Sequence, residues 1–166
     1  ILGGANAIYT QTDGAAFTIH AGQNEIYGSA QSESGTVRGG SNNLSLGAGQ
    51  DYLYVHTQAQ TNTIDMGDDL DFIEVRTGTN RISMGRGSGD RTHLYDGTNT
   101  IVFGTESELD IAVININVGQ TNVEFEPGIR ASDLSFRLAP RDAYGTSTPF
   151  EPGYLGFLEI TMRSTG

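Results

Sequence analysis

Six asparagines recur along the first two thirds of the chain at steps of 18, 18, 20, 18 and 19 residues. Each stands two residues before an aliphatic residue, and five of the six follow a glycine by two positions. A repeat near 19 residues with one constant polar residue type is typical of a chain wound into stacked coils. Stacked amides can donate and accept between coils, so we expect a structural ladder made of Asn6, Asn24, Asn42, Asn62, Asn80 and Asn99.

A second register lies between the asparagines. It consists of Asp51, Asp71, Asp90 and Asp110, spaced by 20, 19 and 20 residues, and each leads a short run of alternating inward and outward residues. The register runs back, more weakly, to Gly35 and Ala15. Alternation of this kind indicates strands, so each coil holds two of them. Two inward residues per strand leave a thin core, which favours two flat sheets over a rounder three-sheet helix.

These patterns predict an all-β fold: a two-sheeted parallel β-solenoid of 18–20 residues per coil, similar to a β-roll. We assign residues 1–117 to the repeat array and residues 118–166 to a β-rich C-terminal cap, because all four prolines lie beyond residue 126. One more strand is expected around Val123. Residues 133–138 and 155–162 alternate, and we expect them to pair as a hairpin across a long loop.

Composition excludes several classes of site. The chain has 166 residues, a net charge of −11 and no cysteine, so disulfides and thiolate metal sites are absent. Phosphates would be repelled, which argues against nucleic-acid partners, whereas divalent cations would be attracted. No apolar run approaches the length of a membrane span, so we expect no membrane insertion.

Residues 47–54 follow the pattern Gly-x-Gly-x-Asp-x-aliphatic-x. This segment resembles the nonapeptide of the repeats-in-toxin (RTX) family, whose members form Ca²⁺-binding parallel β-rolls; the later copies here are degenerate. The resemblance implies Ca²⁺ between successive turns of one edge, bound by turn carbonyls and by the carboxylates of Asp51, Asp69, Asp71, Asp90, Glu108 and Asp110. The alternative is that turns simply favour Asp and that this edge is hydrated.

The outward residues of the second register form a patch of aromatic, arginine and histidine side chains. They are Tyr52, Tyr54, His56, Phe72, Arg76, Arg91, His93 and Tyr95. Such a patch on a flat sheet indicates a binding or assembly face. A neighbouring domain or a second copy is the first interpretation, and a glycan stacked on the rings is the second. Tyr54, Glu74 and His93 could also serve catalysis, but no motif specifies that chemistry.

The sequence therefore predicts a Ca²⁺-stabilised, RTX-like module that serves self-assembly, adhesion or export-coupled folding. The resemblance implies a parent that is extracellular or on the cell surface and exported by a type I-like route. The acidic chain would be weakly stable in a cytoplasm low in Ca²⁺ and would fold outside, because ion binding stabilises the folded state. The alternative function is a β-helical carbohydrate-active enzyme or a glycan-binding domain that uses the Tyr/His/Arg face.

Overall fold

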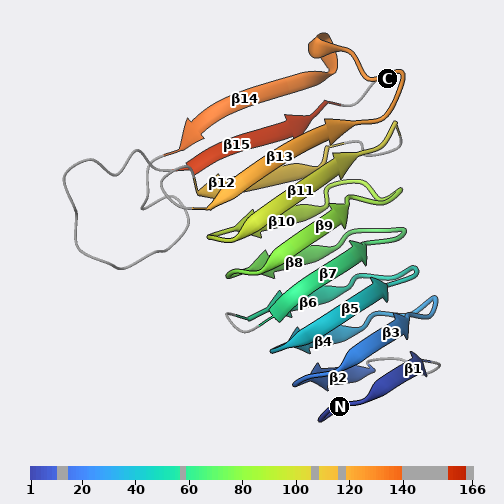
Figure 1. Cartoon of the computed structure of the whole chain (residues 1–166). Coiled ribbons are helices and arrows are strands. Elements are labelled where there is room, and N and C mark those ends of the chain that lie inside the picture. Colours follow the sequence, from blue (N-terminus) through green and yellow to red (C-terminus); the bar gives the residue numbers. More distant parts are fainter. Residues whose placement is uncertain (11–14, 57–58, 106–108, 116–118, 140–156, 164–166) are drawn as a thin grey trace.

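A computed structural model shows two sheets stacked face to face along a solenoid of about six turns (Figure 1). The structure describes residues 1–10, 15–56, 59–105, 109–115, 119–139 and 157–163. Successive coils pair in parallel, with Asn6 opposite Asn24 and Tyr52 opposite Phe72 as examples of the register. The predicted two-sheeted parallel β-solenoid is confirmed.

The first sheet, sheet A, contains seven parallel strands in chain order. They are β1 (Ala5–Tyr9), β3 (Gln23–Tyr27), β5 (Gly40–Ser45), β7 (Ala59–Asp65), β9 (Thr79–Ser83), β11 (Thr98–Phe103) and β13 (Gln120–Phe125). The expected strand around Val123 is therefore present as β13, and it continues sheet A into the segment assigned to the cap.

The second sheet, sheet B, contains eight strands. Six are parallel: β2 (Ala16–Ile19), β4 (Ser34–Val37), β6 (Tyr52–Val55), β8 (Phe72–Val75), β10 (Arg91–Leu94) and β12 (Ile111–Asn115). A short 3₁₀ turn, η1 (Ala131–Asp133), then leads into β14 (Leu134–Ala139), which pairs antiparallel with β15 (Phe157–Met162). Because β15 also pairs antiparallel with β12, the expected hairpin closes this end of sheet B.

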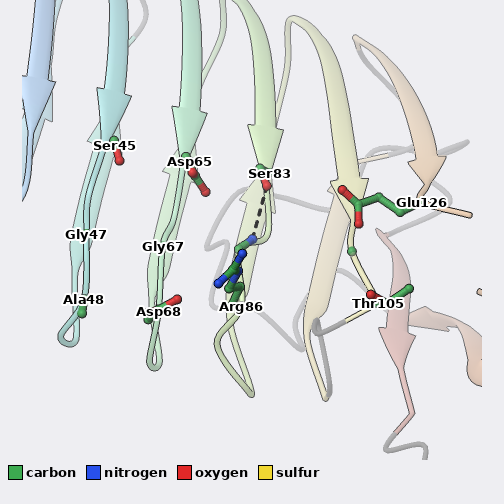
Figure 2. Close-up of a pocket in the computed structure, with 12 residues that line it drawn as sticks. Ser45, Gly47, Ala48, Asp65, Gly67, Asp68, Ser83, Arg86, Thr105 and Glu126 are labelled. Atoms are coloured by element: carbon green, nitrogen blue, oxygen red, sulfur yellow. Dashed lines mark hydrogen bonds between the residues drawn. The ribbon is translucent and has the colours of Figure 1, made fainter.

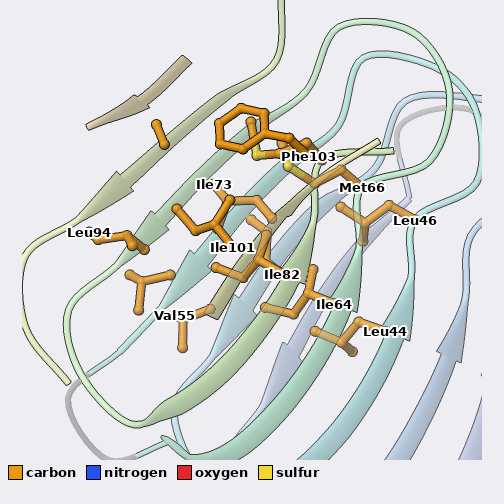
Figure 3. Packing of buried hydrophobic residues seen from close by; sticks show 14 of the residues in the cluster. Leu44, Leu46, Val55, Ile64, Met66, Ile73, Ile82, Leu94, Ile101 and Phe103 are labelled. Atoms are coloured by element: carbon orange, nitrogen blue, oxygen red, sulfur yellow. The ribbon is translucent and has the colours of Figure 1, made fainter. Parts of the chain in front are cut away.

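The core lies between the sheets as a single stripe of side chains, one inward pair per strand (Figure 3). The inward apolar residues of β3 to β12 are buried, whereas Ile8 and Phe17 in the first coil are only partly buried. A terminal coil has a neighbour on one side only, which explains their exposure. The turns of successive coils also stack closely on one another. At Gly67, with φ +92°, a Cβ would lie 1.9 Å from the Gly47 carbonyl oxygen of the preceding coil.

The second register differs from the prediction in one early coil. Gly35 pairs with Leu53, not with Asp51, and Glu33 takes the position equivalent to Asp51. A side chain is sterically excluded at this inward position, because a Cβ on Gly35 would lie 2.3 Å from the ring of Phe17. Gly35 is thus an inward residue without a side chain, and the acidic column begins one coil earlier than predicted.

Candidate functional site: an acidic column and an aromatic face

The asparagine column forms one continuous hydrogen-bonded chain. In each of its five links, Nδ2 of one Asn donates to Oδ1 of the next at 2.8 Å. The same amide nitrogens reach turn carbonyls three residues earlier, such as Gly39 O at 3.3 Å and Asp96 O at 3.0 Å. All members except Asn6 are buried. Every interior amide therefore has a donor and an acceptor partner within the column.

The acidic column stands at the opposite edge, where each strand of sheet B begins. Oδ1 of each Asp accepts the backbone N–H of the equivalent residue in the preceding coil, from Asp51 N to Asp71 Oδ1 at 2.8 Å and from Asp71 N to Asp90 Oδ1 at 2.8 Å. Asp90 N and Asp110 Oδ1 continue the series at 2.9 Å. Each of these aspartates lies directly before a strand of sheet B, and all are at most 3% exposed.

The second oxygen of three of these carboxylates has no such donor. Oδ2 of Asp51, Asp71 and Asp90 is buried without a hydrogen-bond partner. A buried carboxylate left without a partner strongly disfavours ionisation. Burial raises the pKa of Asp51 to about 7, that of Asp71 to about 8 and that of Asp90 to about 6, against the lowering effect of the backbone N–H groups.

The remaining predicted metal residues differ from these three. Asp69 is exposed, adopts φ +75°, and its Oδ2 accepts the Gly49 N–H at 3.1 Å. Glu108 lies outside the described residues. Glu33 is a buried member that the sequence interpretation missed. Its signal is the spacing of 18 residues to Asp51, which the inward glycine at position 35 concealed.

The acidic column suits a hard cation in donor type. Ca²⁺ takes six to eight oxygen ligands, from carboxylates and carbonyls, and the orphaned Oδ2 atoms carry the negative charge that it would neutralise. Within the described residues, no three His, Cys, Asp or Glu side chains converge on one ion position. An ion here would thus take at most two carboxylates, with carbonyl oxygens and water as its other ligands.

The predicted aromatic face is contiguous on the outside of sheet B. The rings of Tyr52 and Phe72 stack at 5.0 Å, and His93 meets Phe72 edge-on at 5.1 Å. Tyr54 meets His56 edge-on at 5.5 Å. The strand register places these residues in neighbouring coils, so the face runs along the solenoid axis.

Arg76 organises the other half of this face. Its guanidinium lies 4.1 Å from the ring centre of Tyr95 and 5.9 Å from that of Tyr54, and it binds the Glu74 carboxylate at 2.5 Å. Burial, reinforced by the charge of Arg91, lowers the pKa of His93 to about 4, so this imidazole is neutral at neutral pH. The aromatic rings of this face thus contact one another or Arg76.

A polar groove of about 680 Å³ crosses the turns that follow β5, β7, β9, β11 and β13 (Figure 2). Glycines 47, 67, 85 and 104 line it, together with Ser45, Ser83 and Thr105. Its charged side chains are the carboxylates of Asp65, Asp68 and Glu126 and the guanidinium of Arg86. Sequence reasoning did not single out this groove, because its residues come from coils of different local sequence.

No helix in the described part of the chain is long and apolar enough to cross a membrane. Comparison with protein-family models, with curated proteins and with solved structures found no match to this chain.

Proposed function

We propose that this chain is a structural module of a secreted or cell-surface protein, stabilised by Ca²⁺ at its acidic column and used for assembly through the face of sheet B. The observation that carries the proposal is the stack of buried carboxylates whose second oxygens lack partners. An acidic stack of this kind needs a compensating charge, because buried like charges raise the free energy of the folded state.

A proton or a cation can supply that compensation. Asp51, Asp71 and Asp90 would hold Ca²⁺ through Oδ2, with turn carbonyls as further ligands. Bound Ca²⁺ supplies positive charge and a polar partner for these oxygens, so the coils can stack with their carboxylates ionised. Extracellular modules bind Ca²⁺ with dissociation constants of roughly 10⁻⁴–10⁻³ M. A site in that range would leave the chain weakly stable in the cytoplasm and stable outside the cell, which suits export-coupled folding.

Assembly is the use that the outer face of sheet B favours. Tyr52 is 45% exposed and its ring stacks on Phe72, and on the same face Arg76 lies over the ring of Tyr95. Aromatic residues and arginine are enriched where protein surfaces meet. A stacked glycan would need open ring faces, whereas these rings contact one another and Arg76. The polar groove lies elsewhere, since no residue of the aromatic face lines it.

Thermal melting followed by circular dichroism tests the Ca²⁺ proposal. At a Ca²⁺ concentration about 100 times the dissociation constant, one site adds about 2.7 kcal/mol of stability. For a chain of this size that corresponds to a rise of roughly 5–10 °C in Tm relative to chelator. Mg²⁺ should do less, since it demands a stricter octahedral geometry.

A pair of matched variants locates the effect. Asp71→Asn keeps the Oδ1 acceptor for the Asp51 N–H and removes the charge, so it should reduce the Ca²⁺-induced rise in Tm. Asp96→Asn makes the same charge change at an exposed position on the asparagine edge and should leave the rise intact. Equal Tm in chelator and in millimolar Ca²⁺ would rule out Ca²⁺ as the stabilising ion.

A further inference from the structure

The charges of this acidic molecule are not spread evenly over its surface. The chain has a net charge of −11. Three of its nine arginines nevertheless lie in or directly after strands of sheet B: Arg38 follows β4, Arg76 follows β8 and Arg91 begins β10. Glu74 is the carboxylate of that face within β8, and Arg76 already binds it. The face is therefore basic and aromatic against an acidic background.

The groove at the turn edge has the opposite character. Asp65 ends β7, Asp68 lies in the turn after it, Glu126 follows β13, and all three carboxylates are exposed. One guanidinium, Arg86, lies among them. Figure 2 shows Asp65 at the end of β7 and Asp68 beyond Gly67, near the tip of the turn that follows, with Glu126 farther along the same edge. This edge is thus an acidic surface that extends over several coils.

We propose that the basic aromatic face of one copy docks against the acidic turn edge of a second copy, so that solenoids associate side by side. This inference rests on the assembly role proposed above and names its partner surface. Charge complementarity supports it, since exposed arginines on one surface meet exposed carboxylates on the other. Tyr52 and Phe72 supply the apolar centre, since stacked rings provide large contact area with little loss of conformational freedom.

The repeat makes the two surfaces commensurate. Arg38 follows β4 and Arg91 begins β10, three strands apart in sheet B. Asp65 ends β7 and Glu126 follows β13, also three strands apart, in sheet A. Neighbouring strands in every sheet are about 4.8 Å apart. Two solenoids whose axes are parallel or antiparallel can therefore bring both charge pairs into range at once.

The two surfaces are different patches of the chain, so the contact is heterologous. Unless the rotation between copies closes a ring, such contacts continue from copy to copy and give open assemblies. The weight-average mass should thus increase with protein concentration beyond that of a dimer. Between about 0.05 and 0.5 M NaCl the association should weaken by at least about tenfold, because salt screens exposed charges.

Sedimentation velocity on the whole chain in millimolar Ca²⁺, combined with a charge swap, tests the proposal. Arg38→Glu with Arg91→Glu should give monomers, and so should Asp65→Arg with Glu126→Arg. Combining all four substitutions reverses both surfaces and should restore association. All four positions are exposed, so the fold should be retained. Glu25→Arg, a charge reversal at an exposed position on sheet A, should associate as the wild type does.

Several outcomes would overturn the inference: a wild type that is monomeric at every concentration, a closed dimer, or association that both reversals leave unchanged. Melting the same samples with Ca²⁺ and with chelator separates the two proposals. A Ca²⁺-dependent Tm in a strictly monomeric chain would remove the docking surface and keep the stabilising ion. Salt-sensitive association without a Ca²⁺-dependent Tm would keep the docking surface and remove the ion.

Discussion

The two edges of the solenoid stack one polar residue per coil, but they differ in how the stack is satisfied. An amide both donates and accepts, so the asparagine column links its members directly at 2.8 Å. An ionised carboxylate only accepts, so a member of the acidic column such as Asp71 accepts the backbone N–H of the preceding coil through Oδ1, and its Oδ2 has no hydrogen-bond partner. The asparagine edge is therefore complete by itself, whereas the acidic edge depends on protons or cations from solution.

Placing a charge in the neutral column should have the largest effect. In Asn80→Asp the new carboxylate can still accept from Asn62 Nδ2, but it cannot donate to Asn99 Oδ1. A buried charge without compensation destabilises by about 3–5 kcal/mol. Urea unfolding at neutral pH measures the loss. A variant as stable as the wild type would show that the asparagine edge tolerates charge as the acidic edge does.

The acidic column should give the molecule an unusual pH dependence in metal-free buffer. Asp51, Asp71 and Asp90 have pKa values of about 7, 8 and 6 in the folded state, raised from 3.8. The folded state therefore binds more protons than the unfolded state between these limits, and the free energy of unfolding falls as pH rises. This contribution is complete below pH 3.8 and is lost as pH rises through 6 to 8.

We expect the free energy of unfolding to be several kcal/mol larger at pH 5 than at pH 8, by urea titration without metal, because the three folded-state pKa values lie one to three units above pH 5. Asp71→Asn should flatten the upper part of this profile and raise stability at pH 8, whereas Asp96→Asn should leave the profile unchanged. Stability that increases from pH 5 to pH 8 would show that these carboxylates are ionised and compensated in the folded chain.

The sequence allowed the fold to be predicted because both registers report local geometry. The alternation after Asp51, with Leu53 and Val55 inward, specifies a strand, and the constant step to Asp71 specifies parallel stacking. The prediction was wrong at Gly35, which was assigned to the position that Glu33 takes. An inward residue without a side chain gives no hydrophobic signal from which the register could be set. The sequence also could not distinguish a hydrated Asp turn from a buried acidic column, since that depends on how tightly coils stack.

The surfaces were predictable to different degrees. The aromatic face follows from the strand period alone, so Tyr52 and Phe72 could be placed side by side. The acidic groove could not, because Asp65, Asp68 and Glu126 occupy unrelated positions in their coils. The contact of Arg76 with Tyr95 was also beyond the pattern, since it depends on the rotamer of a long side chain.

Removing single side chains from the asparagine column tests how much its hydrogen bonds contribute to the free energy of unfolding. Asn62→Ala leaves Asn80 Oδ1 without its donor and removes the acceptor of Asn42 Nδ2. Each buried group left unsatisfied costs about 1–3 kcal/mol. Asn6→Ala should cost less, because that residue ends the column and is only partly buried. Equal, negligible losses at both positions in urea unfolding would mean that these amides exchange their bonds for water.

The smallest expected effect concerns the turns, where the two edges also differ. The described turns of the asparagine edge have glycine at positive φ, as at Gly22 and Gly97, whereas the acidic edge holds Leu109 at φ +62°. Leu109 is 51% exposed, so removing its side chain loses little burial. Leu109→Gly should therefore stabilise the fold by about 0.5–1 kcal/mol, because a left-handed conformation is unfavourable for residues with a Cβ.

Leu70→Gly is the matched control, because Leu70 stands directly before Asp71 as Leu109 stands directly before Asp110. Leu70 is 49% exposed and does not share the positive φ, so glycine there should destabilise by about 0.5–1 kcal/mol through chain entropy. Opposite signs for the two substitutions, measured by urea unfolding in Ca²⁺, would attribute the gain to relief of the Leu109 backbone. Equal losses would mean that the acidic edge holds Leu109 in place by contacts worth more than its strain, so that this edge would be rigid even where its sequence lacks the favoured glycine.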